Sequence, residues 1–372
     1  MNNHEYYLER TLELAKLGWG KTNPNPLVGA VIVKDGQIIA EGYHRQIGED
    51  HAEVDAFNRA REDVRGGTLY VNLEPCSHFG RTPPCTKKII ESGICRVVVA
   101  MEDPNPKVSG AGIRLLREAG IEVVVGIIDE KARKLNEIFI KYITRKNPFV
   151  LLKTAMTLDG KIASVSGDSR WISGESSRQQ VHLLRNRFAA IMVGSNTVIS
   201  DNPALTTRLR TGDGRDPIRI IIDSKGLIPL ESNVINSESA AQVILATTSA
   251  IEPKKESQLI AKGVQILKLD SPDGHVDLVE LLNQLYRQEI DSILLEGGGG
   301  LNAAFLKLGL VDKVMVFIAP KIIGGENAKT PVAGSGIQLM KNALQLNNIN
   351  VSRLDDDLVV EGYLKGEPCL LE

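Results

Sequence analysis

Three potential metal ligands and one carboxylate lie close together in the first quarter of the chain. His51 and Glu53 belong to the segment GEDHAE, while Cys76 and Cys85 belong to the segments LEPCSH and TPPC. Zinc prefers imidazole and thiolate ligands, and a catalytic zinc keeps one of its four tetrahedral positions open for water. One histidine and two cysteines supply three ligands. The set His51, Cys76 and Cys85 therefore predicts a catalytic zinc site.

Glu53 lies two residues after His51, where a carboxylate can move protons without binding the metal. Zinc lowers the pKa of its bound water to near neutrality, which makes hydrolytic attack on an amidine-like ring carbon possible. The pattern H-x-E with P-C-x-x-C is typical of base deaminases. Cys76 and Cys85 both follow prolines, which favour helix starts, and a thiolate at a helix N-terminus has a lowered pKa. We therefore expect Glu53 to be catalytic.

The spacing of the two cysteines departs from that general pattern, because eight residues rather than two separate Cys76 from Cys85. Two alternatives follow. His78 could complete a closed structural zinc site, or the cysteines could simply be buried in a core, as cysteine often is. Cys95 falls in an apolar strand pattern and is expected in the core, and no role is assigned to Cys369.

The segments around these residues alternate between strands and helices. Residues 5–18 have helical spacing of apolar side chains, and Asp35 and Gly36 join two strands in a hairpin pattern. Further segments predict an α/β layered sheet: helices at 51–60, 83–93 and 112–120, and strands at 68–73, 96–101 and 121–126.

A charged helix predicted at 129–142 leads into the run RKNP at 145–148, where proline ends helical structure. We place a domain boundary there, which gives domains 1–146 and 147–367. A second strand–helix alternation follows, and residues 344–364 predict an antiparallel hairpin at a sheet edge. Both domains are therefore expected to be α/β.

The composition of the chain is that of an ordinary globular protein. Its 372 residues carry a formal net charge of -2, with 42% hydrophobic residues and four cysteines. This charge argues against nucleic acid or a membrane surface as partner. We find neither a signal peptide nor a run of roughly 20 apolar residues, and the few cysteines favour a reducing cytoplasm.

The second domain gives weaker signals. Residues 292–300 (SILLEGGGG) run from an apolar strand into a helix expected to begin near Leu301, and glycines there would let a phosphate approach the helix N-terminus. A tight packing turn is the alternative, and no G-x-G-x-x-G pattern follows the first strand. Arg185 and Arg208 could clamp a phosphate bidentately, or they could be surface charges. Lys153, after a strand pattern, would ordinarily be solvated.

Four blocks of the sequence resemble the deaminase half of the bifunctional riboflavin-biosynthesis deaminase/reductase family. They are residues 22–31 (TNPNPLVGAV), 51–54 (HAEV), 74–85 (EPCSHFGRTPPC) and 103–106 (DPNP). The wide Cys76–Cys85 spacing is similar to that of the family. The resemblance extends over the whole chain and implies a cytidine-deaminase-like layered domain followed by a dihydrofolate-reductase-like α/β domain.

The resemblance also implies ligands and contacts. Zn²⁺ and NADPH would be the cofactors, and a phosphorylated pyrimidine would be the substrate. Residues carried over as NADPH contacts are Ala155, Trp171, Thr197, Asp201, Ser224, Gly298, Gly299, Gly300, Leu301, Asn302, Ala303 and Ala304. Residues carried over as substrate contacts of the reductase are Ser169, Arg185, Leu205, Arg208 and Glu296. Substrate contacts in the deaminase would be Asn25, Arg81, Asp103 and Asn105, although an asparagine between prolines can also simply form a turn.

Lys153 would face the reductase substrate, and we hypothesise that its ammonium polarises the carbonyl or imine that accepts hydride. The implied reactions are deamination of 2,5-diamino-6-ribosylamino-4(3H)-pyrimidinone 5′-phosphate and then reduction to 5-amino-6-(5-phospho-ribitylamino)uracil. Residue chemistry alone does not separate NADPH from NADH, because no arginine marks a 2′-phosphate site. A homo-oligomer is expected. The alternatives are a base or nucleic-acid deaminase with a non-catalytic second domain, and a zinc-stabilised binding protein.

Overall fold

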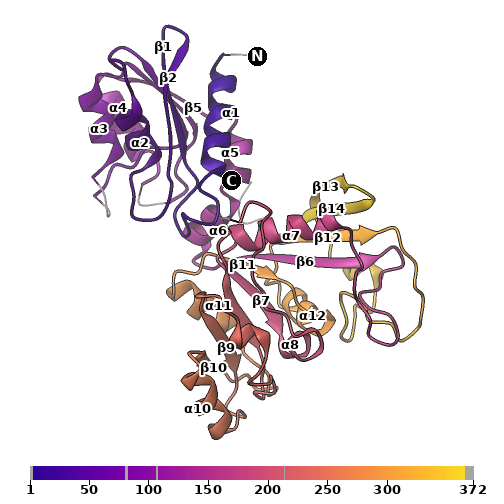
Figure 1. The fold of residues 1–372 in the computed structure, drawn as a ribbon. Helices are drawn as coiled ribbons and strands as arrows, with labels where there is room; N and C mark the ends of the chain where they lie inside the picture. Colours follow the sequence, from indigo (N-terminus) through magenta and orange to yellow (C-terminus); the bar gives the residue numbers. More distant parts are fainter. Residues whose placement is uncertain (1–2, 80–82, 106–107, 213, 365–372) are drawn as a thin grey trace. The chain divides into compact units, whose positions relative to one another are not determined.

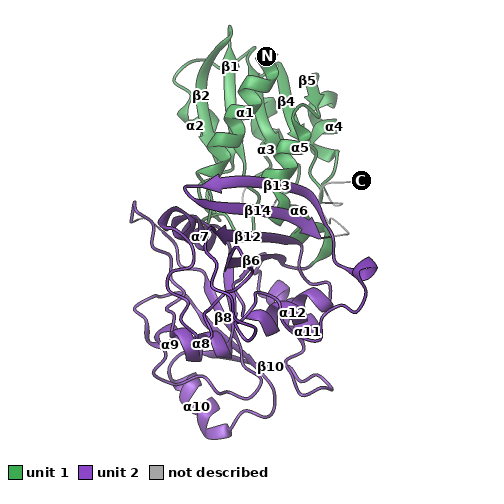
Figure 2. Cartoon of the chain, turned by 90° about the vertical axis from the view of Figure 1, so that its right-hand side faces the viewer, with its two compact units in different colours: residues 1–146, 368–372 green, residues 147–367 purple. Residues whose placement is uncertain are grey.

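A computed structural model of the protein describes residues 3–79, 83–105, 108–212 and 214–364 (Figure 1). The chain divides into two compact units, residues 1–146 and residues 147–367 (Figure 2). Each unit is built around one β-sheet, which confirms the prediction of two α/β halves. Among the described helices, none is long and apolar enough to cross a membrane.

The sheet of the first unit has five strands in the order β2-β1-β3-β4-β5. β1 is antiparallel to β2 and β3, while β3, β4 and β5 are parallel. The predicted hairpin turn is confirmed, and both Asp35 and Gly36 have positive φ, as a two-residue type I′ turn requires. The strands are β1 (Gly29–Lys34), β2 (Gln37–Tyr43), β3 (Thr68–Leu73), β4 (Arg96–Met101) and β5 (Glu122–Val125).

Alternate side chains of these strands face two separate cores, as the period of two in a strand dictates. Val31 and Val33 pack with α1, α5 and α6 on one face of the sheet, whereas Ala30 and Ile32 pack with α2, α3 and α4 on the other. The helices are α1 (Asn3–Lys16), α2 (Ala52–Arg59), α3 (Cys85–Ser92), α4 (Ala111–Glu118), α5 (Asp129–Leu135) and α6 (Glu137–Arg145).

The single helix predicted over 129–142 is wrong, because the chain forms α5 and α6 with a break at Asn136. The Asn136 side chain is buried and bonds to the backbone of Leu27, accepting from its N–H at 2.8 Å and donating to its C=O at 3.0 Å. A tertiary contact therefore sets the break, and helical periodicity does not reveal it.

The sheet of the second unit has nine strands in the order β10-β9-β8-β7-β11-β6-β12-β14-β13. Its strands run parallel except β14, which pairs antiparallel with both β12 and β13. The predicted closing hairpin is confirmed, with β13 at the sheet edge. The strands are β6 (Phe149–Thr157), β7 (Ala190–Gly194), β8 (Ile218–Ile222), β9 (Val243–Thr247), β10 (Gln265–Lys268), β11 (Ser292–Leu295), β12 (Lys313–Ala319), β13 (Leu346–Leu354) and β14 (Asp357–Leu364).

Two cores again cover the faces of this sheet. One contains Met192 and Leu295 with apolar side chains of α11 and α12, and the other contains Ile191 and Val193 with those of α8, α9 and α10. The helices are α7 (Glu175–Arg187), α8 (Ser195–Asp201), α9 (Asn233–Asn236), α10 (Pro253–Ala261), α11 (Leu278–Arg287) and α12 (Gly299–Lys307), with a 3₁₀ turn η1 (Met340–Asn342).

Candidate active sites

The three predicted metal ligands come together at one end of the first sheet. His51 directly precedes α2, Cys76 follows β3, and Cys85 is the first residue of α3. The Nδ1 atom of His51 lies 3.5 Å from Cys76 Sγ and 3.3 Å from Cys85 Sγ, and the three donor atoms are all within 4.8 Å of one another. One nitrogen and two sulfurs at these separations fit a zinc ion with a fourth position left for water. Among the described residues His78 is not part of this group, which argues against the closed four-ligand alternative.

The helix prediction for the two thiols is right at only one of them. Cys85 begins α3, but no helix begins at Cys76. Cys76 instead accepts a hydrogen bond from the backbone N–H of Cys85 at 3.3 Å. The Cys85 side chain and then His51 lower the pKa of Cys76 to about 4, against the opposing effect of burial. Cys95, expected in a core, is exposed and bonds to the backbone carbonyls of Gly66 and Gly67, so that prediction is wrong.

Glu53 is the second residue of α2 and is only 3% exposed. Burial raises the pKa of its carboxyl, although the neighbouring His51 opposes that shift. The helix is held close to β2 because Gly42 has no side chain, and a Cβ there would collide with the backbone of Ala52 and Ala56. This close packing places the buried Glu53 carboxyl beside the three ligands.

His44 is a buried residue that the sequence analysis missed. Its Nδ1 lies 3.0 Å from the carbonyl oxygen of Asp50, and its Nε2 lies 3.2 Å from Nδ2 of Asn25. Because a carbonyl only accepts, Nδ1 carries the proton and Nε2 accepts from the Asn25 amide. The His44 ring meets that of His51 edge to face, with centroids 5.5 Å apart. The predicted substrate contact Asn25 is thus tied to the metal site through His44, and no sequence spacing indicates this link.

Asp103 and Asn105 follow β4, at the same end of the sheet. The Asp103 carboxylate accepts the backbone N–H of Asn105 at 2.8 Å, and burial raises the pKa of Asp103 to about 6. Its carboxyl is near enough for the charges of His78 and Cys76 to act on it as well. The structure therefore brings Asp103 to the metal site, while Arg81 lies outside the described residues.

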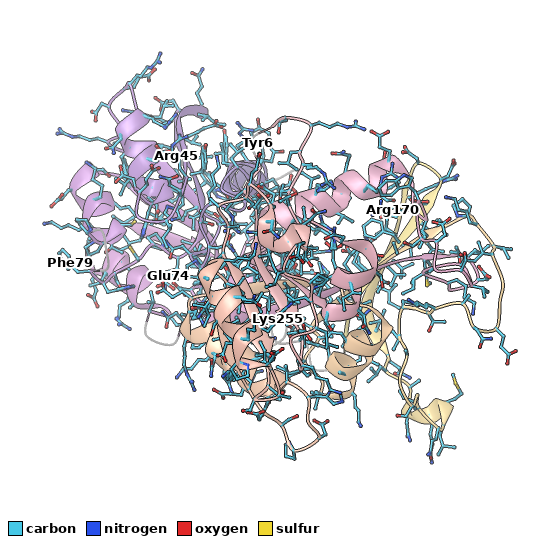
Figure 3. The ribbon with its side chains drawn as sticks, turned by 60° about the horizontal axis from the view of Figure 1, so that its bottom comes forward. Tyr6, Arg45, Glu74, Phe79, Arg170 and Lys255 are labelled. Carbon is cyan, nitrogen blue, oxygen red and sulfur yellow. The ribbon has the colours of Figure 1, made fainter. Side chains whose placement is uncertain are left out.

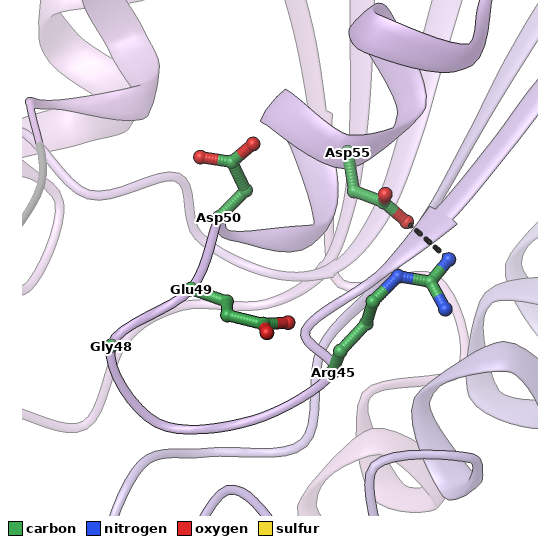
Figure 4. Close-up of a pocket in the computed structure, with 5 residues that line it drawn as sticks. All are labelled: Arg45, Gly48, Glu49, Asp50 and Asp55. Carbon is green, nitrogen blue, oxygen red and sulfur yellow. Dashed lines mark hydrogen bonds and ion pairs between the residues drawn. The ribbon is translucent and has the colours of Figure 1, made fainter.

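A small acidic pocket lies beside the loop that leads from β2 to His51 (Figure 4). Arg45 reaches across it to the carboxylate of Asp55 at 3.2 Å. Arg45 also donates to the Tyr43 hydroxyl at 2.8 Å, so its guanidinium is held by β2 and its charge is paired with Asp55 on α2. The lining residues are Arg45, Gly48, Glu49, Asp50 and Asp55.

The second site is centred on Glu296, which follows β11. Strand pairing sets Leu295 beside Leu152, so Glu296 lies next to Lys153 on β6. The Lys153 Nζ is 3.7 Å from Glu296 Oε2, and Arg185 donates two hydrogen bonds to Glu296 at 2.9 and 3.1 Å. Each of the three side chains is 13% exposed. Lys153 lies in the middle of a strand and is mostly covered, so the expectation of a solvated strand-end lysine is wrong.

The negative charge of Glu296 and the positive charges of Arg185 and Lys153 act on one another. Burial raises the pKa of Glu296, but Arg185 and Lys153 outweigh that effect and lower it to about 2. The remaining guanidinium nitrogen of Arg185 donates to Thr206 O at 3.1 Å. Arg185 is therefore not free for the bidentate phosphate clamp considered above, whereas the side chain of Arg208 is exposed. The Arg208 N–H donates to Nδ1 of His182 at 3.2 Å.

The glycine-rich segment forms the turn between β11 and α12. The helix begins at Gly299, two residues before the predicted start, and Gly298 is its N-cap. Gly300 has open space around it, whereas a Cβ on Gly299 would press on Thr330 O at 2.7 Å. Asn302 is fully buried, and its amide donates to Gly297 O and Pro331 O. The NH₂ group of Asn302 is thus engaged and not available for the predicted NADPH contact, whereas its Oδ1 is buried without a hydrogen-bond partner among the described residues.

The other predicted contacts of the second unit lie on several elements. Ala155 is on β6, Thr197 and Asp201 are on α8, and Ser224 accepts the N–H of Val276 through its hydroxyl. Trp171 is 64% exposed and lies under the guanidinium of Arg178. The Leu205 side chain packs in a core, and Ser169 is half-buried. Leu301, Ala303 and Ala304 are partly buried on α12.

Comparison with known proteins identifies both halves. Residues 1–101 match the family described as the cytidine and deoxycytidylate deaminase zinc-binding region, and residues 148–360 match the RibD C-terminal domain. The chain is 46% identical over 355 residues to the riboflavin biosynthesis protein RibD of Actinobacillus pleuropneumoniae, covering 95% of this chain and 94% of that one.

Two solved structures resemble the whole chain. RibD of Acinetobacter baumannii superposes with a TM-score of 0.87 at 37% identity, covering 98% of this chain and 99% of that one. A diaminohydroxyphosphoribosylaminopyrimidine deaminase/5-amino-6-(5-phosphoribosylamino)uracil reductase from Thermotoga maritima gives 0.85 at 43% identity, covering 97% and 99%. The deaminase-like and reductase folds expected from the sequence are confirmed, and the chain belongs to the RibD family of bifunctional riboflavin-biosynthesis deaminase/reductases.

Proposed function

We propose that the first unit removes the pyrimidine amino group of 2,5-diamino-6-ribosylamino-4(3H)-pyrimidinone 5′-phosphate. The second unit then reduces the ribosyl chain of the deaminated product to ribityl with NADPH. Membership of the RibD family supports both activities, and the Thermotoga maritima relative is named for the same pair. The observation that carries the first activity is the group His51, Cys76 and Cys85 with its buried neighbour Glu53.

In the first unit, His51, Cys76 and Cys85 would hold zinc, which supplies the Lewis acidity that lowers the pKa of water. Burial raises the pKa of the Glu53 carboxyl, which makes it a stronger base than an exposed carboxylate. As a carboxylate it can take a proton from the attacking water, and as the resulting acid it can deliver that proton to the departing amine. Asp103, Asn105 and Asn25 surround the same end of the sheet and bind the pyrimidine substrate in this proposal, together with Arg81.

In the second unit, NADPH supplies the hydride. Burial lowers the pKa of Lys153, and the neighbouring Glu296 carboxylate opposes that shift by favouring the ammonium form. In this proposal the Lys153 ammonium donates to the carbonyl or imine that is being reduced. Arg185 orients the Glu296 carboxylate through two hydrogen bonds. The turn Gly298–Gly300 at the start of α12 offers backbone N–H groups to the phosphates of the nucleotide. Ala155, Trp171, Thr197, Asp201 and Ser224 complete the proposed nucleotide contacts, and Ser169, Leu205 and Arg208 complete those to substrate.

Separate assays of ammonia release and NADPH oxidation test the two assignments. Glu53→Gln should abolish ammonia release while zinc content and NADPH oxidation on the deaminated substrate stay at wild-type levels. Cys85→Ser should lose zinc, whereas Cys95→Ser, at an exposed thiol outside the cluster, should retain it. Ammonia release by Glu53→Gln at the wild-type rate would refute the role of this carboxyl.

The role of Lys153 has its own matched control. Lys153→Met should stop NADPH oxidation while ammonia release continues. Lys313→Met removes another buried lysine of the same sheet, paired with Glu361 at 3.6 Å, and should leave NADPH oxidation intact. Loss of NADPH oxidation in both variants would mean that the sheet, and not the Lys153 ammonium, is at fault. Competition with RNA or single-stranded DNA should have no effect on ammonia release.

A further inference from the structure

The buried carboxylate of Glu74 makes an unusual set of contacts in the first unit (Glu74 is labelled in Figure 3). The residue follows β3, is 3% exposed, and accepts four backbone N–H groups, two from the segment between β4 and α4 and two from the first turn of α4. Oε1 accepts from Gly112 at 2.8 Å and Ile113 at 3.2 Å, and Oε2 accepts from Asp103 at 3.1 Å and Gly110 at 3.0 Å.

Two of these bonds replace a helix cap. The first N–H groups of a helix have no partner within it, and a side chain at the N-cap ordinarily supplies one. The N-cap of α4 is Gly110, which has no side chain to do so. Glu74 bonds to Gly112 and Ile113 instead, and its negative charge is favourable at the positive end of the helix.

The other two bonds fix both ends of the connection that precedes the helix. Asp103 N and Gly110 N donate to the same oxygen, Oε2. Asp103 in turn accepts the N–H of Asn105. One carboxylate therefore holds the positions of two side chains that the proposed function assigns to substrate binding.

Glu74 is also joined to the metal site through the backbone. Cys76 is two residues further along, and the Glu74 N–H donates to Met101 O at 3.0 Å. A Cβ on Gly112 would collide with Pro75 O, so the start of α4 packs directly on the backbone between Glu74 and Cys76. The segment 103–105 is thereby held at a fixed distance from a metal ligand.

We propose that Glu74 is a positioning residue of the deaminase, which sets Asp103 and Asn105 relative to the metal site so that substrate binds in register with it. This inference rests on the proposed deaminase function. Glu74 itself does not touch substrate, because its two oxygens are occupied by backbone N–H groups. Its effect is therefore expected mainly on substrate KM.

Glu74→Gln in the full-length zinc enzyme tests this proposal. An amide keeps the size of the side chain, but its NH₂ group faces one of the two pairs of N–H donors and repels them. We expect the deaminase KM to rise at least about tenfold, with kcat changed less, zinc retained and NADPH oxidation unchanged. Hydrogen exchange of amides in 103–113 should accelerate. Glu102→Gln removes a neighbouring exposed carboxylate and serves as the matched control, with wild-type KM and exchange.

Faster exchange in 103–113 with an unchanged KM overturns the proposal, because the segment would then be held by Glu74 without mattering to substrate. Zinc loss with lower kcat at unchanged KM also overturns it, since Glu74 would then only support the metal ligands. If Glu74→Gln does not fold, Glu74→Asp, whose shorter carboxylate reaches fewer donors, should give a smaller KM rise of the same kind. Absence of ammonia release in the wild-type enzyme would refute the proposed function, and the exchange measurement would still judge the contact.

Discussion

Replacing Glu296 with Gln removes the one carboxylate that Lys153 and Arg185 share in the second unit. The substitution preserves the shape of the side chain and removes the carboxylate that both cations contact, each of them only 13% exposed. Burial raises the pKa of Glu296, but the charges of Arg185 and Lys153 outweigh it and bring the pKa from 4.5 to about 2. That difference corresponds to about 3 kcal/mol in the free energy of unfolding at neutral pH. Removing one partner of a buried ion pair typically costs about 3–5 kcal/mol, which agrees in size.

The pH dependence of this effect has a definite sign. The folded-state pKa of Glu296 is lower than its unfolded value, so the stabilisation is complete above about pH 4.5 and is lost as the pH falls toward 2. Linkage leaves somewhat less than half of it at pH 3. The difference in unfolding free energy between wild type and Glu296→Gln should therefore shrink by roughly half between pH 7 and pH 3.

Urea unfolding followed by hydrogen exchange in peptides of each unit measures this difference, and peptides of the first unit act as an internal reference. Glu175→Gln is the control, because Glu175 pairs with Arg210 at the surface with both side chains more than half exposed. Such a pair contributes about 1 kcal/mol or less. A loss in Glu296→Gln no larger than that in Glu175→Gln, or one that does not depend on pH, would refute the electrostatic account of this site.

Three further perturbations have defined outcomes. Gly42→Ala should push α2, and with it Glu53, away from β2, because the new Cβ meets the backbone of Ala56. Ammonia release should fall while NADPH oxidation persists. Equal loss of both activities would contradict this expectation. Asp357→Ala should lower the unfolding free energy of the second unit by about 1–2 kcal/mol in a urea titration. The reason is that this buried carboxylate caps α7 by accepting from Gly174 N and the Ser177 hydroxyl. Asp356→Ala, at the exposed neighbour, should have little effect in the same titration. Burial, Arg185 and Arg208 lower the pKa of His182 from 6.5 to about 4, so the unfolded state binds the proton more readily and stability should fall as the pH drops from 6.5 to 4. An NMR titration of His182 with a midpoint near 6.5 would show that account to be wrong.

The sequence predicts those parts of the molecule that local patterns determine. The Asp35–Gly36 turn has a residue preference strong enough to identify the first hairpin. The metal site is predictable because a metal constrains the types of its ligands, His51, Cys76 and Cys85. The break at Asn136 is different, since it depends on a bond to Leu27, 109 residues away. No propensity at position 136 contains that information.

The second site illustrates the same limit. Lys153 and Glu296 are 143 positions apart in the sequence, and only the register of β6 against β11 makes them neighbours. Taken alone, each is an ordinary charged residue, and the local pattern around Lys153 predicts a solvated side chain. The fourfold contact of Glu74 and the link from His44 to Asn25 are likewise products of tertiary packing. Side chains that bind the backbone of distant segments leave no periodic trace in a sequence.

The capping of α7 by Asp357 has a consequence for the order in which the second unit is completed during synthesis. Gly174 is the N-cap of this helix and has no side chain, so its cap comes from a residue 183 positions later, on the last strand. A ribosome releases Asp357 only after almost all of the unit has emerged, and until then the start of α7 stays open to water. Contacts of such long sequence separation form late and slow folding. The helix that carries Arg185 should therefore reach its final stability only when β14 joins the sheet. Pairing of the C-terminal hairpin is then the step that makes folding of the second unit cooperative.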